Sequence, residues 1–180
     1  MATKQGKWRT RDLTLMALMT VMICICTWIC IPGPVPFTLQ TFAVFTALEL
    51  LGGQRAFWTV AAYLLMGAAG LPVFAGMAGG FGILLGPTGG YLAGFLVLAL
   101  VYRGMMSLPG RENFLRTMGL LLGLVACYTM GTAWYVLVSG SGAAGLTAAV
   151  LTCVVPFVLP DLVKLRLAMA VGRWLRRHIG

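Results

Sequence analysis

The chain of 180 residues is 60% apolar and only 9% charged, whereas about 25% of the residues in an ordinary soluble domain carry a charge. These values exclude a secreted disulfide scaffold, a disordered tail and a conventional cytosolic enzyme, and they indicate an integral membrane protein. The net charge of +9 does not indicate a nucleic-acid partner, which would need a basic face on a soluble fold, so we expect the charges to face anionic lipid headgroups.

Long uncharged stretches, divided at clusters of proline and glycine, predict the membrane spans. A spanning helix needs about 20 mostly apolar residues, and no charge occurs between Asp12 and Glu49. The division gives six spans, at approximately 13–31, 38–51, 56–70, 88–103, 115–138 and 158–176. We therefore predict a single all-α membrane domain over residues 1–180, built as a bundle of six transmembrane helices.

The basic residues predict how these spans are oriented. If both chain ends are cytoplasmic, the inner segments contain eleven of the 13 basic residues and the outer connections contain none, as the positive-inside rule requires. The inner basic residues are Lys4, Lys7, Arg9, Arg11, Arg55, Arg103, Arg111, Arg116, Arg173, Arg176 and Arg177. We predict a multi-pass protein of the bacterial cytoplasmic membrane with cytoplasmic N- and C-termini.

The residues that catalysis or ATP hydrolysis requires are missing from the sequence. It has no phosphate-binding loop of the form G-x-x-x-x-G-K-[ST], and its single histidine, His178, lies in the basic tail. Its four acids form no pair suited to metal-assisted hydrolysis, and its five cysteines lie in apolar surroundings as small fillers. We expect a protein that binds a molecule in the membrane, not an enzyme, and we expect no cofactor or metal.

Two outward segments are too rich in proline and glycine to be regular spans. Three prolines fix the backbone of residues 32–36, so this segment is expected to form a preorganised cap that presents Phe37, Thr38 and Gln40. The second segment, residues 67–90, contains nine glycines. We expect it to fold over or into the bundle, because non-helical backbone at membrane depth must be buried or line a cavity. A flexible connector is the alternative interpretation.

The last span contains the strongest indication of a binding site. Pro156 and Pro160 are four residues apart, so we predict a new helix with Pro160 in its first turn, where proline is accepted. Asp161 would then lie at the positive end of the helix dipole, and Lys164, one turn later, would share its face. Ionisable residues at this depth are costly and usually line a functional cavity. The alternative is an ion pair that satisfies only itself, and Arg166, two residues beyond Lys164, is expected to point elsewhere.

Three other polar residues are less informative. Glu49 and Arg55 bracket two glycines at the inner end of the second span, and we interpret them as an interfacial pair or as snorkelling groups. Tyr91 begins the fourth span on the outer side, where its hydroxyl is placed to reach a ligand. Packing alone is an equally good explanation for this tyrosine.

Four segments together resemble the BioY family, the biotin-specific substrate-binding (S) components of energy-coupling-factor transporters. They are Pro34-Val35-Pro36-Phe37-Thr38-Leu39-Gln40-Thr41, Gly70-Leu71-Pro72-Val73-Phe74-Ala75-Gly76, Leu85-Gly86-Pro87-Thr88-Gly89-Gly90-Tyr91 and Leu159-Pro160-Asp161-Leu162-Val163-Lys164. They occur in family order and with family-like spacing. The resemblance implies that a site capped by the first outer loop captures biotin from outside the cell. It also implies partners, namely a transmembrane coupling subunit and two cytoplasmic ATPases that energise uptake.

The chemistry of biotin fits these residues. The ligand combines an apolar bicycle and tail with one ureido group and one carboxylate, which suits a mostly apolar site with a few placed polar groups. We assign Asp161 as the acceptor for the ureido N–H groups and Lys164 as the counter-ion of the carboxylate. Another arrangement of these roles stays open, because residues one turn apart must contact opposite ends of the elongated ligand unless it lies across the helix. The other predicted ligand-binding residues are Phe37 and Tyr91, which would pack on the rings, Thr38, Gln40, Gly79 and Gly80, which would complete the hydrogen bonds, and Phe74.

The resemblance also implies that small residues four apart on the first helix contact the coupling subunit, because small side chains let helices approach closely. Leu13 and Val21 flank Ala17 in this register. Thr14, Ala17 and Thr20 are therefore the looser substitute that we predict for this interface.

Two other functions stay open on the sequence alone. One is the same architecture carrying another vitamin, such as thiamine or riboflavin. The other is a membrane scaffold that transports nothing and whose glycine- and proline-rich loops serve helix packing.

Overall fold

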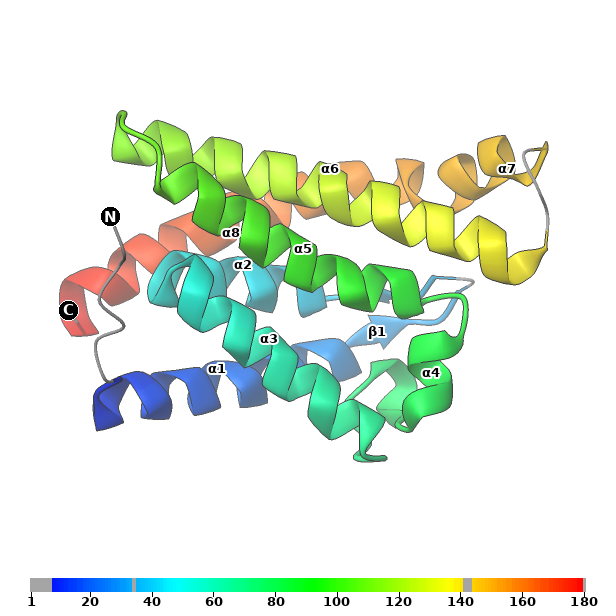
Figure 1. Cartoon of the computed structure of the whole chain (residues 1–180), viewed down its shortest axis with the longest axis horizontal. Helices are drawn as coiled ribbons and strands as arrows, with labels where there is room; N and C mark the ends of the chain where they lie inside the picture. The colour runs from blue at the N-terminus through cyan, green and yellow to red at the C-terminus, as the bar shows by residue number, and fades with distance from the viewer. Residues whose placement is uncertain (1–7, 34, 141–143, 180) are drawn as a thin grey trace.

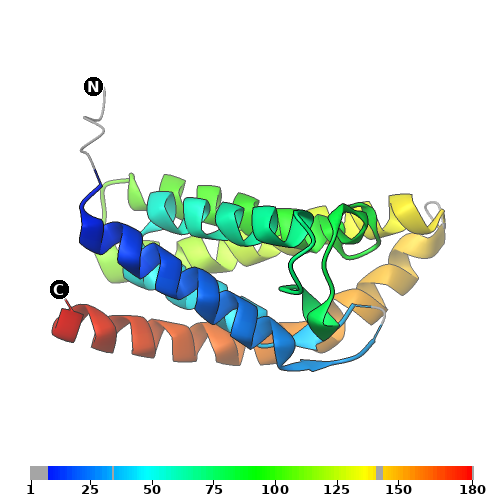
Figure 2. The ribbon, with the colours of Figure 1, turned by 90° about the horizontal axis from the view of Figure 1, so that it is seen from below.

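The computed structural model describes residues 8–33, 35–140 and 144–179, which form a bundle of helices (Figures 1 and 2). The long helices are α1 (Thr10–Trp28), α2 (Gln40–Leu51), α3 (Gly53–Ala68), α5 (Gly89–Met106), α6 (Glu112–Ser139) and α8 (Val155–Ile179). They are joined by the strands β1 (Cys30–Ile31) and β2 (Phe37–Thr38), the 3-10 turn η1 (Ala75–Met77) and the short helices α4 (Phe81–Leu85) and α7 (Ala144–Cys153). Each predicted span coincides with one of the long helices.

Helix length and composition agree with the predicted membrane character. In the described chain, four segments are long and apolar enough to cross a membrane, namely α1, α5, α6 and the continuous stretch Gly145–His178. Helix α2 has 12 residues and α3 has 16, so they are only about 18 and 24 Å long at 1.5 Å per residue. The chain is thus an all-helical membrane protein with four apolar span candidates, and the count of six spans stays a prediction.

The segments that we predicted to face the cytoplasm lie together. The start of α1, the end of α8, the α2–α3 turn and the α5–α6 connection gather at one end of the bundle (Figure 1). The β1–β2 hairpin, α4 and the start of α7 lie at the opposite end. We call these the basic end and the hairpin end. The side of the membrane that each end faces stays a prediction, and Lys4, Lys7 and Pro34 lie outside the described residues.

Helix α8 begins earlier than the sequence predicted. The expected start with Pro160 in the first turn is wrong, because α8 begins at Val155 and runs through Pro160. Helix α7 ends at Cys153 and α8 begins at Val155. The interruption of the helix at Val154 accommodates Pro156, which has no N–H to continue the hydrogen bonds of α7. Asp161 therefore lies well beyond the first turn, where the helix dipole no longer stabilises its charge.

Helices α5 and α6 pack closely because glycines face large side chains across their interface. A Cβ atom at Gly94 would lie 2.8 Å from the sulfur of Cys127, and one at Gly131 would overlap the ring of Tyr91. Small residues allow this approach of two membrane helices. The close contact fixes Tyr91 and Cys127 beside each other near the hairpin end.

The predicted pair of Glu49 and Arg55 is not formed. Arg55 instead lies 3.0 Å from Asp12, which joins α3 to α1. The fully buried Glu49 carboxylate lies 3.0 Å from Arg176 of α8 and 3.4 Å from Arg116 of α6. The reason is tertiary, since α2 packs mainly on α8 whereas α3 packs on α1 and α5.

Candidate functional site

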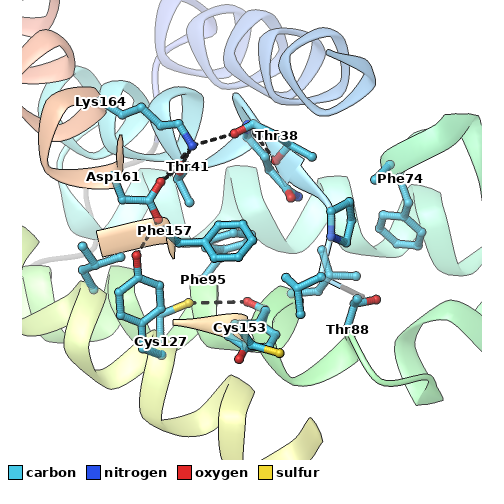
Figure 3. A pocket seen from close by; sticks show the side chains of 18 of the residues that line it. Thr38, Thr41, Phe74, Thr88, Phe95, Cys127, Cys153, Phe157, Asp161 and Lys164 are labelled. Atoms are coloured by element: carbon cyan, nitrogen blue, oxygen red, sulfur yellow. Dashed lines mark hydrogen bonds and ion pairs between the residues drawn. The ribbon is translucent and has the colours of Figure 1, made fainter. Parts of the chain in front are cut away.

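A cavity of about 190 Å³ lies between the hairpin, the loop after α3 and helices α2, α5, α6 and α8 (Figure 3). Most of its wall is apolar, with a few polar groups. The lining residues are Val35, Pro36, Thr38, Gln40, Thr41, Phe74, Ala75, Ala78, Ile83, Thr88, Tyr91, Leu92, Phe95, Leu124, Cys127, Tyr128, Cys153, Phe157, Asp161 and Lys164. This composition is typical of a site for a small, mostly apolar ligand.

The predicted pair of Asp161 and Lys164 is formed in the wall of this cavity. Lys164 Nζ lies 2.8 Å from Asp161 Oδ1, and the exposed fractions of the two residues are 6% and 2%. With Leu165, Ala168 and Met169 they form the buried face of α8, at the i, i+3, i+4 spacing of one helix face. The helical period thus directs both charges into the bundle.

The ion pair has further partners on other elements. Thr41 of α2 donates to Asp161 Oδ1 at 2.9 Å, and Tyr128 of α6 donates to Asp161 Oδ2 at 2.7 Å. Lys164 donates to the carbonyl oxygen of Thr38 at 2.7 Å (Figure 3). Buried charges persist only when paired and hydrogen-bonded. The interpretation of a pair that satisfies only itself therefore does not describe this network, which holds both groups in fixed positions beside a cavity.

Four of the other predicted ligand-binding residues line the cavity, namely Thr38, Gln40, Phe74 and Tyr91. Gln40 donates from Nε2 to the hydroxyl of Tyr63 at 2.9 Å, and the Tyr91 hydroxyl lies 3.0 Å from the hydroxyl oxygen of Thr132. The hydroxyl of Tyr91 is thus bound within the protein, and its ring forms part of the wall.

Three predicted ligand-binding residues lie outside the lining. Phe37 packs beneath Lys164, whose Nζ is 4.1 Å from the ring centre, a distance at which a cation is attracted to the ring. The amide of Gly80 donates to the carbonyl of Gly67 at 2.7 Å. A Cβ atom at Gly79 would overlap the carbonyl oxygen of Leu71. Both glycines therefore serve to fold the loop after α3.

Comparison with known proteins places the chain in a family. The model of the BioY family matches residues 1–180. This chain belongs to the BioY family. It is 40% identical to the biotin transporter BioY of Thermotoga maritima, over 93% of this chain and 96% of that protein. It is 34% identical to the probable biotin transporter BioY of Pyrococcus horikoshii, over 93% of this chain and 98% of that protein.

The fold of this BioY chain is also similar to that of a solved structure. The crystal structure of the S-component for biotin from an ECF-type ABC transporter superposes with a TM-score of 0.81 and 28% sequence identity. The match covers 98% of this chain and 95% of the other. The predicted resemblance is confirmed, and the relatives are named as transporters, which agrees with the prediction that the chain is not an enzyme.

Sequence reasoning missed three polar residues of this BioY cavity, namely Thr41, Thr88 and Tyr128. Thr41 and Tyr128 complete the hydrogen bonds of Asp161, but neither was predicted to be in the site. A usable indication existed for Tyr128, because a hydroxyl in the interior of an apolar span must find a hydrogen-bond partner. Cys127 and Cys153, which were interpreted as fillers, also line the cavity.

The predicted partner interface on α1 is split between two faces. Thr14 and Ala17 are exposed. Thr20 is buried, and its hydroxyl lies 2.9 Å from the carbonyl oxygen of Met16 and 3.4 Å from that of Thr59 on α3. Thr20 therefore packs inside this BioY bundle, and Thr14 and Ala17 are the part of the predicted interface that faces outward.

The loop after α3 is fixed at both of its ends. Trp28 donates from Nε1 to the carbonyl of Pro72 at 2.8 Å, and Trp134 donates to that of Gly86 at 2.9 Å. Phe74, on this loop, is 2% exposed and packs edge-on against Tyr63. The predicted fold of this segment over the bundle is thus observed, and the alternative of a flexible connector does not describe it.

Gly67→Ala is expected to lower the free energy of unfolding by about 1–3 kcal/mol, the usual cost of overpacking. A Cβ atom at Gly67 would overlap the ring of Phe74, so this ring must leave its place in the cavity wall. Thermal unfolding of the purified protein measures the effect. The matched control is Gly82→Ala in α4, where a Cβ atom would meet nothing within 4 Å. Equal melting temperatures for the two variants would contradict the packing described.

Proposed function

We propose that this chain is the S component that captures biotin from outside the cell for uptake. The observation that carries the proposal is the cavity whose wall contains the buried Asp161–Lys164 pair. The names of the relatives support biotin as the ligand. The cavity offers one carboxylate and one ammonium group in a mostly apolar wall, which complements a ligand with N–H donors, a carboxylate and apolar rings.

In the proposed complex, Lys164 binds the biotin carboxylate and Asp161 accepts from the ureido N–H groups. Thr41 and Tyr128 hold Asp161 in place through hydrogen bonds, so this acceptor is preorganised and loses little conformational entropy on binding. Lys164 donates to Thr38, Thr41 and Asp161, so one of these three bonds is exchanged for the bond to the carboxylate. The rings of Phe74 and Tyr91 would pack on the apolar parts of the ligand. Thr38 and Gln40 are the further polar residues in reach of it.

The partners and the location follow from the same proposal. We infer six spans, with the basic end in the cytoplasm and the hairpin end outside the cell, in a bacterial cytoplasmic membrane. A transmembrane coupling subunit and two cytoplasmic ATPases would energise uptake, because the chain has no phosphate-binding loop of its own. The exposed Thr14 and Ala17 on α1 are the proposed contact with the coupling subunit.

Calorimetry with a panel of vitamins tests the proposed ligand. The protein, purified in lipid nanodiscs, is titrated in parallel with biotin, thiamine and riboflavin. Biotin is expected to bind and the other two are not, because thiamine is a cation and would favour more acidic and aromatic groups than this cavity offers. Binding of another vitamin in place of biotin would overturn the assignment. Binding of none would favour the scaffold interpretation.

A further inference from the structure

A second hollow lies outside the ligand cavity, between α6 and the α7–α8 segment, and has a volume of about 600 Å³. We call it the groove. One wall is the part of α6 from Leu121 to Ala133. The opposite wall is a stripe of apolar residues spaced four apart, which continues from α7 into α8: Leu146, Val150, Val154, Val158 and Leu162.

The polar side chains in the groove already have partners within the protein. Tyr128 donates to Asp161 at 2.7 Å, and Thr129 donates to a carbonyl of its own helix at 2.8 Å. The hydroxyl of Thr132 lies 3.0 Å from that of Tyr91. None of the described residues that line the groove is charged. An occupant therefore finds neither charge nor free hydrogen-bonding side chain, and the complementary occupant is a hydrocarbon chain.

The size of the groove agrees with one acyl chain. One leaflet contributes about half of a hydrocarbon core that is about 30 Å thick, so an acyl chain extends over roughly 15 Å. The wall on α6 is about 18 Å long at 1.5 Å per residue. A transmembrane helix of a partner would cross the whole core of about 30 Å. The groove is therefore shorter than such a helix and close in length to one acyl chain.

The groove is continuous with the surface that meets the bilayer. Its walls belong to the two longest apolar span candidates, and Val125 and Leu146 are 60% and 48% exposed. Helix α6 packs mainly on α5 and α8 mainly on α2, which leaves the space between α6 and α8 open to lipid. The hydrocarbon nearest to this opening is the acyl chain of a membrane phospholipid.

We propose that one phospholipid acyl chain occupies the groove and forms the outer support of the ligand cavity. Leu124 and Tyr128 line both hollows, so a single layer of side chains separates the acyl chain from the ligand. The acyl chain holds Tyr128 against Asp161 and thereby keeps the hydrogen bonds of the Asp161–Lys164 pair in place. The coupling between lipid and ligand rests on the proposed function, whereas occupancy of the groove does not.

Photocrosslinking of the parent protein and of two variants tests whether an acyl chain occupies the groove. The parent protein is reconstituted in vesicles that contain a phospholipid with a diazirine in its acyl chain, and the labelled peptides are identified by mass spectrometry. Adducts are expected to concentrate on residues 121–133 and 146–162. Val150→Phe, which places a ring in the stripe that forms one wall of the groove, is expected to reduce them. The matched control Leu65→Phe, on α3 at a residue that is 70% exposed, retains them. Adducts spread evenly over the exposed apolar surface would overturn the proposal.

Native mass spectrometry and ligand binding test the coupling. The gently extracted protein is expected to retain one phospholipid, and Val150→Phe is expected to lose it. Stripping the lipid is expected to weaken biotin binding several-fold, and adding phospholipid back is expected to restore the affinity. Unchanged biotin affinity after stripping would overturn the coupling, and a second copy of the chain in place of the lipid would overturn the occupancy. If the protein retains the lipid but never binds biotin, the proposed function fails while the occupancy of the groove stands.

Discussion

Lys164→Met is expected to weaken biotin binding roughly ten- to hundredfold. A hydrogen bond to a charged group contributes about 1.5–3 kcal/mol, and each 1.4 kcal/mol is tenfold in affinity. The substitution also leaves Asp161, which is 2% exposed, without its cation, and an uncompensated buried charge disturbs the cavity further. Calorimetric titration of biotin into the variant measures the loss.

The matched control for this variant is Arg166→Met. Arg166 lies on the same helix, two residues further on, but it is exposed and outside the cavity lining. We expect the biotin affinity of this variant to stay within about twofold of the parent, because Arg166 does not line the cavity. The control is matched because each substitution removes one positive charge from α8. If Lys164→Met binds biotin as tightly as Arg166→Met does, the assignment of Lys164 is wrong.

The role of Lys164 can be separated from that of Asp161 with the methyl ester of biotin, which lacks the negative charge. In the parent, the ester is expected to bind at least tenfold more weakly than biotin. In Lys164→Met, the difference is expected to disappear, because the two changes remove the same interaction and are not additive. If the full difference persists in the variant, the carboxylate binds elsewhere and the assignment of Lys164 is wrong.

Glu49→Ala is expected to destabilise the protein by about 3 kcal/mol without removing the ligand site. The Glu49 carboxylate is buried between Arg116 and Arg176 and accepts from the hydroxyl of Tyr102 at 3.1 Å, so it joins α2 to α5, α6 and α8. Removing one partner of a buried ion pair costs about 3–5 kcal/mol, and the partial exposure of the two arginines places the effect at the lower end. Thermal unfolding is expected to show a decrease of roughly 6–12 °C in Tm.

Glu112→Ala is the control for this second variant, because Glu112 pairs with the same Arg116 but is exposed. An exposed pair contributes about 0–1 kcal/mol, so its Tm is expected to change by at most a few degrees. Biotin affinity, measured well below the melting temperature, is expected to be similar in both variants, since neither acid lines the cavity. Equal melting temperatures would show that Glu49 does not hold the basic end together.

The positions of the helices could be predicted from the sequence because hydropathy and breaks at proline or glycine are local properties. Each predicted span overlaps a long helix, and the ends of the two differ by a few residues. The start of α8 was missed because the sequence does not show which of two prolines a helix will place in its first turn. The structure places Pro156 there and Pro160 inside the helix.

The site could be predicted only in part, for a related reason. Asp161 and Lys164 were identified because charged residues within an apolar span are exceptional and share a helix face. Thr41 and Tyr128 were missed because the contacts that bring them to Asp161 join residues 120 and 33 positions away in the chain. The ion-pair partners of Glu49 and the inward direction of Thr20 also depend on how the helices pack on one another. The pattern of apolar spans in the sequence does not show this packing.

The structure of this protein with biotin bound, determined by crystallography or electron microscopy, tests most directly whether the Asp161–Lys164 cavity is the binding site. We predict density for biotin between Phe74, Tyr91 and α8, with one polar end of the ligand within hydrogen-bonding distance of Lys164 Nζ and the other at Asp161. Density for the ligand elsewhere, with the Asp161–Lys164 pair unchanged beside an empty cavity, would contradict the assignment.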